Sequence, residues 1–405
     1  MTKKNPAVIP VCACLLVQLC VGIIYLWSVF NAPVTASFKM SASAGAMVSS
    51  YMLFAFVIGT FAGGFVNDRR GPRFTVTIGV VMFGLGVGLS GLLTEKSAWL
   101  INLTYAALGG LGSGFSYTSC LSCVQKWFPT RRGFASGLAA ASFGFSTVVF
   151  APLSRWIMNV FTDAGTGLVD FTPVFFILGG IFLAVGLAAS RFISLPETTD
   201  SAASGAKLSS VYPDDLSTGA VLKTLPFWCI FFTIFFSAAT WTLVLPLISD
   251  LGVERGLSLS AATATVSLTG VVNTVGRLAL ASLSDKIGRY ATIISIACMT
   301  IAGALLLTFI GGVGYSAAIM LIAFAYGGPG PLAGAFAVDF FGAKNSARNF
   351  GLITLSLGFS SVLWNTVANR LLHGSPSATF IMASILAAVP IVLMFILRRC
   401  ADKRK

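Results

Sequence analysis

The segment GFVNDRRGPR, Gly64–Arg73, returns in altered form later in the chain as LSDKIGRY, Leu283–Tyr290. Asp68 in the first segment and Asp285 in the second stand 217 residues apart, and the glycines three residues after them keep the same separation. Self-similarity at a fixed offset indicates an internal repeat. The chain is therefore expected to consist of two related halves.

A second pair of segments repeats this offset independently. WFPTRRGFASG occupies residues 127–137 and FFGAKNSARNFG occupies residues 340–351, which places Arg131 and Arg348 217 residues apart as well. Two matches at one offset are hard to obtain by chance, so they strengthen the prediction of two halves with the same order of elements.

The composition shows what kind of elements these halves contain. Of 405 residues, 56% are hydrophobic and 10% are charged, with a mean hydropathy of +0.89, which is typical of an integral membrane protein. A bilayer core needs roughly 20 apolar residues per helix. We expect an all-α protein with twelve transmembrane helices in two six-helix bundles. The expected spans are 7–30, 44–66, 74–93, 98–122, 134–158, 172–192, 226–249, 258–282, 292–310, 315–337, 348–370 and 376–398.

The distribution of charge predicts domains and orientation. A polar segment, 193–223, is expected to be a cytoplasmic linker between an N-terminal bundle, 1–192, and a C-terminal bundle, 224–405. If both termini are cytoplasmic, 20 of the 26 lysines and arginines lie inside, as the positive-inside rule requires. The net charge of +13 then reflects topology and calls for no nucleic-acid partner. The first run is read as a retained span, and we expect a multi-pass protein of a plasma or bacterial inner membrane.

The repeated loops are expected to clamp neighbouring helices. An acid beside clustered guanidinium groups at a helix–loop–helix junction caps helix ends and forms charge-assisted hydrogen bonds, which a conformational cycle makes and breaks. The residues assigned to this gating role are Asp68, Arg69, Gly71, Arg73, Asp285, Lys286, Gly288, Arg289, Arg131 and Arg348.

Of the 26 lysines and arginines, 20 are assigned to the inside and five near span ends to the outside, which leaves Arg277 inside an expected span, in GVVNTVGRLALASLSD (270–285). A guanidinium in the hydrocarbon region costs at least ~2.5–3.5 kcal/mol, and such residues usually face a cavity and mark a functional site. Asp285 lies eight residues on, roughly 12 Å along a helix, too far for a direct pair. Snorkelling toward the helix end is the alternative. Asn273, one turn earlier, favours a polar cavity wall where Arg277 binds an anion bidentately.

The signature residues of both loops resemble the major facilitator superfamily, which implies two six-helix bundles around a central site. Within that superfamily, GIIYLWSVFNAPV (22–34), WFPTRRGFASG (127–137) and NSARNFG (345–351) are similar to the oxalate/formate antiporter and monocarboxylate transporter group. This resemblance covers essentially the whole chain. It implies a carrier of small carboxylates in which Arg277 binds the carboxylate group.

Three tyrosines are weaker candidates for substrate binding. Tyr25 and Tyr117 fall where the oxalate/formate group also has tyrosines, and Tyr326 lies at the edge of AYGGPGPLAG (325–334), a Gly- and Pro-rich stretch expected to bend or gate. For Tyr25 and Tyr117, ordinary aromatic packing is the alternative, and for the stretch with Tyr326 the alternative is a kinked helix that only packs. Further candidates for the cavity wall are Trp241, Asn365 and Asn369, for which packing and helix bridging stay open.

Departures from the group's pattern bear on the substrate. Oxalate carriers of the group have a second cation, a lysine, where the resemblance places Leu357. With one cation, a dianion would keep an uncompensated charge in a low-dielectric site, whereas a monoanion would be neutralised. A monocarboxylate such as lactate or pyruvate is therefore favoured over oxalate. The lysine and the acid that the animal monocarboxylate transporters have in helices one and eight are both missing here.

The coupling mechanism stays open between proton symport and anion exchange. Symport usually needs an acid that neutralises the arginine in the empty carrier, and the expected spans show no such core acid. Asp250, Glu254 and His373 are weak candidates near the outer surface. The resemblance and the single cation favour proton-coupled symport.

Other classes of function fit the sequence less well. An enzyme would need a nucleophile–base or metal constellation, and one histidine with acids mostly in loops offers none. No cofactor or metal is expected. A multidrug exporter would need an intramembrane acid, whereas a non-transporting receptor of the same fold stays open. We expect the carrier to act as a monomer in the lipid bilayer.

Overall fold

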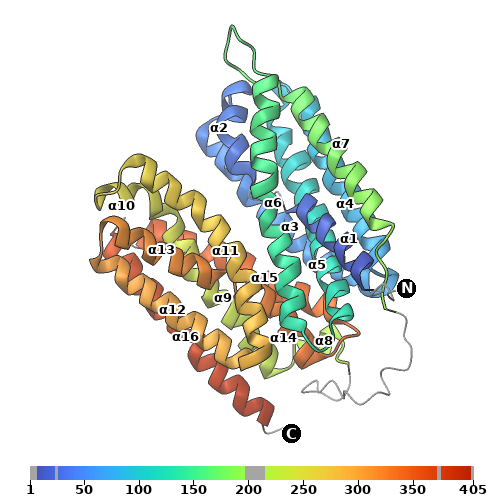
Figure 1. Cartoon of the computed structure of the whole chain (residues 1–405), viewed down its shortest axis with the longest axis vertical. Helices are drawn as coiled ribbons and strands as arrows, with labels where there is room; N and C mark the ends of the chain where they lie inside the picture. Colours follow the sequence, from blue (N-terminus) through green and yellow to red (C-terminus); the bar gives the residue numbers. More distant parts are fainter. Residues whose placement is uncertain (1–6, 23–25, 197–214, 372–374, 403–405) are drawn as a thin grey trace, which may run out of the picture. The chain divides into compact units, whose positions relative to one another are not determined.

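The computed structural model describes residues 7–22, 26–196, 215–371 and 375–402 (Figure 1). Within these ranges the chain is helical, apart from loops and one isolated β-bridge between Thr162 and Val169. Nine of the described helical segments are long and apolar enough to cross a membrane. The α-helices of the first half are α1 (Val8–Val21), α2 (Trp27–Ser37), α3 (Ala42–Arg70), α4 (Pro72–Leu89), α5 (Gly109–Trp127), α6 (Arg132–Val160) and α7 (Phe171–Ser190).

The second half repeats the pattern, with short helices between some of the long ones. Its α-helices are α8 (Thr218–Val221), α9 (Leu225–Val244), α10 (Ile248–Glu254), α11 (Leu259–Ile287), α12 (Arg289–Phe309), α13 (Gly312–Tyr326), α14 (Pro329–Phe341), α15 (Ser346–Leu371) and α16 (Pro376–Asp402). Each expected apolar run coincides with one or more of these helices. In the run 7–30, α1 forms the first part and α2, which extends to Ser37, begins in the last part, and residues 23–25 lie outside the described residues. The run 98–122 starts in a 3₁₀ segment (Glu95–Asn102) and a π-helical segment (Leu103–Leu108) before α5. The run 226–249 breaks after α9, and 315–337 breaks between α13 and α14.

The internal repeat is confirmed at the level of helix ends. Helices α3 and α11 both have 29 residues, and their N-caps, Ser41 and Ser258, again stand 217 residues apart. Each serine hydroxyl accepts a hydrogen bond from the backbone N–H three residues on, at 3.2 Å in both helices. Such a cap satisfies one of the N–H groups that a helix start leaves without an intrahelical partner.

The two helices also end alike, at glycines. Gly71 has φ +84° and Gly288 has φ +90°, a left-handed region that side-chain-bearing residues rarely adopt. Each glycine ends one long helix and directly precedes the next, α4 and α12. The glycines of the repeated loops are therefore required by the backbone turn that reverses the chain.

The chain forms two compact units. One comprises Met1–Trp127 and Ser142–Ala202, and the other comprises Phe128–Ala141 and Ala203–Lys405, so the first turns of α6 belong with the C-terminal helices. In unit 1, α5 packs against α3 and α4, and α4 packs against α7. In unit 2, α9 packs against α15 and α16, and α11 packs against α13. The predicted bundle limits, 1–192 and 224–405 with a linker at 193–223, stay a prediction.

Candidate functional site

Arg277 lies in the span formed by α11, ten residues before the helix ends at Ile287, or about 15 Å along the axis. Its side chain is partly buried, and its Nε donates a hydrogen bond to Oδ1 of Asn273 at 3.0 Å. Nη1 donates to the backbone carbonyl of Ala140, in the first half of α6, at 3.3 Å. Because Asn273 lies one turn earlier, the guanidinium extends away from Asp285 and does not snorkel toward the loop.

Asn273 holds this arginine in place. Its side chain is 8% exposed, and Nδ2 donates to the backbone carbonyl of Ala323 in α13 at 3.1 Å while Oδ1 accepts from Arg277. The amide thus joins α13 to the guanidinium through both of its ends. In this structure Asn273 orients the Arg277 side chain, and its predicted place in the substrate site stays a prediction.

Helix packing around Arg277 is unusually close because the contacts are made by glycines. A Cβ added to Gly276 would lie 2.2 Å from the carbonyl oxygen of Phe324, and one on Gly327 would lie 2.6 Å from the backbone nitrogen of Arg277. On the other side, a Cβ on Gly137 of α6 would lie 2.8 Å from the carbonyl oxygen of Arg277. Small residues at such interfaces let helix backbones approach closely in membranes. The backbone that bears Arg277 is therefore fixed from two sides.

This packing gives a test with a control on the same helix. We expect Gly276→Ala to lower the melting temperature of the purified protein, because its methyl group would displace α13 from α11 by overpacking, which typically costs about 1–3 kcal/mol. Gly270→Ala makes the same chemical change where no atom lies within 4 Å, and should leave the melting temperature unchanged or slightly higher. Equal effects in thermal unfolding would contradict the close contact at Gly276.

The expected break in the Gly- and Pro-rich stretch is confirmed. Helix α13 ends at Tyr326 and α14 begins at Pro329, with Gly327 and Gly328 between them. The Tyr326 ring stacks on Trp241 of α9, with ring centroids 5.3 Å apart and planes 14° apart. Two neighbouring residues at this break thus make different contacts: Tyr326 stacks on Trp241, and Gly327 packs against the backbone of Arg277. Its role as a gate stays a prediction.

Tyr117 of α5 belongs to unit 1, where it is 6% exposed and packs edge-on against Phe56 and Phe143. Tyr25 and His373 lie outside the described residues, as do the side chains of Asn365 and Asn369. Asp250 and Glu254 are both exposed on α10, so their environment is that of surface carboxylates.

Asp285 and Arg289 of the repeated loop are joined to each other, and Asp285 is also joined to the start of α6. Oδ1 of Asp285 accepts hydrogen bonds from Nη1 of Arg289 at 2.6 Å and from the backbone N–H of Gly133 at 2.9 Å. Its Oδ2 accepts from the backbone N–H of Phe134 at 2.7 Å. Gly133 and Phe134 belong to the first turn of α6, whose N–H groups have no intrahelical partner and carry partial positive charge. One carboxylate therefore caps α6 and ties it to the α11–α12 turn.

Two further members of this cluster were missed by the sequence analysis. Asp339 of α14 pairs through Oδ1 with Nη1 of Arg132 at 2.6 Å and through Oδ2 with Nε of Arg289 at 2.9 Å. The side chains of Arg132 and Arg289 are 9% and 14% exposed. The available signal was an acid near the end of an otherwise apolar run, AFAVDFFG (335–342). Of the two adjacent arginines, Arg132 makes this ion pair, and Arg131 is exposed.

The first copy of the loop differs from the second. Oδ1 of Asp68 accepts a hydrogen bond from Nδ2 of Asn67 at 3.3 Å, while Arg69 and Arg73 are exposed. In the second copy, Lys286 is exposed and Arg289 is bound as described. Arg348 is partly buried in the first turn of α15. Whether these residues act as gates stays a prediction.

Comparison with known proteins identifies the family. The family model of the Major Facilitator Superfamily matches residues 12–364. The chain belongs to the Major Facilitator Superfamily. Members of this superfamily are transporters and not enzymes, and the twelve-helix fold expected from the sequence is confirmed. The protein is therefore a multi-pass membrane transporter of the superfamily.

Relatives within the superfamily are distant but cover most of the chain. The chain is 29% identical to the oxalate:formate antiporter of Oxalobacter formigenes over 87% of its own length and 81% of the relative's. It is 25% identical to an uncharacterized MFS-type transporter, YhjX, of Escherichia coli K12, over 86% of its own length and 84% of the relative's. The apicoplast pyruvate carrier 1 of Toxoplasma gondii is 23% identical over 80% and 69%.

Solved structures show the fold. The fucose:proton symporter of E. coli superposes with a TM-score of 0.72 at 15% identity, covering 97% of this chain and 99% of that one. The proton:xylose symporter XylE gives the same TM-score at 15% identity, covering 96% and 94%. At this identity the likeness concerns the arrangement of helices alone.

Proposed function

We propose that this protein is a secondary transporter of a small monocarboxylate of the lactate or pyruvate class, coupled to protons, with Arg277 binding the substrate carboxylate. The observation that carries the proposal is the position of Arg277 within the α11 span, with its Nε held by Asn273. An intramembrane guanidinium is costly, and such residues mark substrate or ion pathways. The planar fork of an arginine matches a carboxylate bidentately.

The surroundings of Arg277 favour a small anion. There is little space between Arg277 and α13, because the contacts at Gly276 and Gly327 already bring that segment against α11. The relatives include an oxalate:formate antiporter and a pyruvate carrier, whose names designate small carboxylates. Leu357 of α15 supplies no charge where oxalate carriers of the group have their second cation, so a monoanion is favoured over a dianion.

Anion exchange is the second candidate, and the likeness to the oxalate:formate antiporter favours it. In exchange, an unloaded Arg277 would resist occlusion, because its charge would be enclosed in a low-dielectric site without a counterion, and the empty carrier could not return. In symport, a protonatable acid would release the arginine for substrate.

Uptake of radiolabelled L-lactate into proteoliposomes tests the proposal and separates the two mechanisms. Accumulation driven by an inward proton gradient in empty vesicles supports symport. Uptake that requires preloaded lactate or formate, with or without the gradient, supports exchange. Unlabelled pyruvate should compete, while oxalate should compete poorly. Absence of flux under both conditions, with formate and pyruvate also tested as substrates, would contradict a carboxylate carrier and favour a receptor of the same fold.

The positioning role of Asn273 predicts a specific kinetic defect. We expect Asn273→Ala to raise KM for the carboxylate by about tenfold or more, because a hydrogen bond to a charged group contributes roughly 1.5–3 kcal/mol and Arg277 would lose its fixed orientation. Thr274→Val is the control, since the Thr274 hydroxyl bonds to the carbonyl of Gly270 within α11 and not to Arg277. Equal KM values in the two variants would contradict the positioning role.

A further inference from the structure

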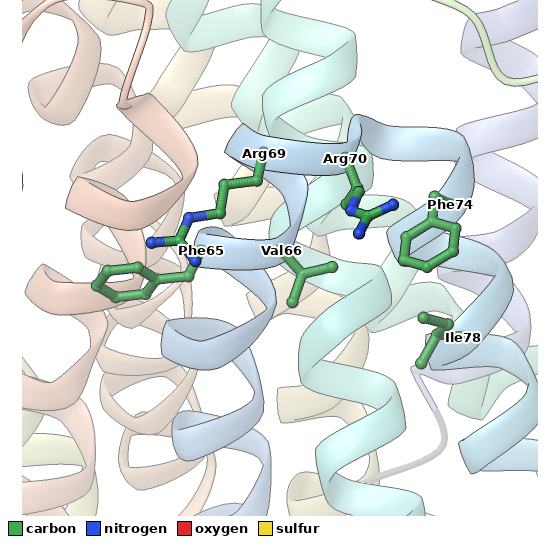
Figure 2. Close-up of a pocket in the computed structure, with 6 residues that line it drawn as sticks. All are labelled: Phe65, Val66, Arg69, Arg70, Phe74 and Ile78. Carbon is green, nitrogen blue, oxygen red and sulfur yellow. The ribbon is translucent and has the colours of Figure 1, made fainter.

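A groove of about 350 Å³ lies in unit 1 where α3 ends and α4 begins (Figure 2). Its lining residues come from the last turns of α3 and the first two turns of α4: they are Phe65, Val66, Arg69, Arg70, Phe74 and Ile78. Figure 2 shows the Arg70 side chain turned toward the Phe74 ring and the Arg69 side chain on the side of Phe65. The groove therefore has an apolar wall, with one arginine at its rim on each side.

The two arginines are accessible and retain their charge for a ligand. Arg69 and Arg70 are exposed, and within the described part of the chain neither forms an ion pair with a carboxylate. The Arg70 guanidinium carbon lies 5.8 Å from the centroid of the Phe74 ring, within reach of a cation–π attraction that limits its freedom. Phe74 itself is 46% exposed, an aromatic ring at the start of a membrane span.

The internal repeat provides a comparison within the same molecule. At the 217-residue offset, Arg70 corresponds to Ile287 and Phe74 corresponds to Ala291, so the second loop has neither member of the Arg70–Phe74 pair. In the second loop, Arg289 forms ion pairs within the protein, with both Asp285 and Asp339. Within the described residues, Arg69 and Arg70 thus differ from Arg289 in forming no ion pair with a carboxylate.

We propose that this groove binds one anionic phospholipid, whose headgroup phosphate is attracted by Arg69 and Arg70 at the rim. The part of an acyl chain nearest the headgroup lies along the apolar wall. Val66 of α3 and Ile78 of α4, two helices that span the membrane, contribute to this wall. Basic clusters at the end of a transmembrane helix attract anionic headgroups, and arginine matches phosphate bidentately. The combination of cationic rim and apolar wall commits the site to a lipid rather than to a free phosphate.

Native mass spectrometry of the full chain in detergent tests the site, with phosphatidylglycerol as the probe. We expect Arg69→Gln/Arg70→Gln to weaken phosphatidylglycerol binding by about tenfold or more. Arg398→Gln/Arg399→Gln is the matched control, because it removes two adjacent exposed arginines at the end of another apolar helix, α16. Neither residue lines the groove, so this change should alter binding by less than about twofold. Phe74→Ala should weaken binding without changing the charge.

Three results would overturn the proposal. They are unchanged phosphatidylglycerol binding by the Arg69→Gln/Arg70→Gln variant, equal retention of phosphatidylcholine, and binding of inorganic phosphate or glycerophosphoglycerol as strong as that of the lipid. If the double glutamine variant does not fold, Arg69→Lys/Arg70→Lys replaces it, because lysine retains the charge. Phosphatidylglycerol binding by Phe74→Ala is then compared with binding by Arg398→Gln/Arg399→Gln. Binding is measured without transport substrate, so the result is independent of the proposed function.

Discussion

Replacement of Arg277 by glutamine should reduce carboxylate uptake into proteoliposomes by about a hundredfold or more, while the protein still folds and inserts. Truncating one partner of a desolvated charge pair costs about 2–5 kcal/mol or more, and here the other partner would be the substrate carboxylate. Glutamine still donates hydrogen bonds, but it lacks the positive charge that would neutralise the anion. The defect should therefore appear in binding as well as in flux.

Lysine at this position separates charge from geometry. We expect Arg277→Lys to transport more weakly than the wild type, by about tenfold, because an ammonium group keeps the charge but cannot form the planar bidentate pair or the same bond to Asn273. Arg398→Gln removes an exposed arginine from the end of α16 and serves as the control for charge loss. Wild-type uptake by Arg277→Gln, in protein that elutes as a folded species, would refute the carboxylate site.

Much of the fold could be predicted because membrane helices are specified locally. Apolar runs of about twenty residues, serine caps and glycine turns give the helices and their repeat, and the glycine at 71 has the same positive φ as the one at 288. The break between α13 and α14 followed from the Gly-Gly-Pro order at 327–329. The 3₁₀ turn at Leu245–Leu247, inside the expected run 226–249, was missed, since mean hydropathy does not reveal where a continuous apolar segment changes helix.

The site could be predicted less completely because side-chain partners depend on helix packing. Arg277 is conspicuous as a charge inside a span, but the bond from Asn273 to the carbonyl of Ala323 depends on how α11 meets α13. The offset of 217 residues pointed to Arg131, whereas neighbouring positions on a helix face about 100° apart and it is Arg132 that meets Asp339. Matching a repeat locates equivalent positions, and it does not locate contacts that one half makes alone.

Replacement of Asp339 by asparagine should lower the stability of the protein more than a single neutralising change at Arg132 or Arg289, the two arginines of the same charged cluster. The carboxylate neutralises Arg132 and shares Arg289 with Asp285, and both arginine side chains are largely buried. Removing one partner of a buried ion pair leaves an uncompensated charge and typically costs about 3–5 kcal/mol. Because the Asp339 side chain is 27% exposed, we expect a loss near the lower end, measured as a fall in melting temperature.

A double-mutant cycle distinguishes this ion pair from general damage to α14. If Arg132 is destabilising only when Asp339 is absent, Arg132→Gln combined with Asp339→Asn should be less destabilised than the sum of the single variants, by about 0.5–3 kcal/mol. The control is the exposed pair of Arg398 and Asp402, which is 3.9 Å apart, and whose Asp402→Asn change should cost less than about 1 kcal/mol. Strict additivity at Arg132 and Asp339 would show that the two residues stabilise the protein independently. The cluster would then not be the clamp that joins α6, α12 and α14.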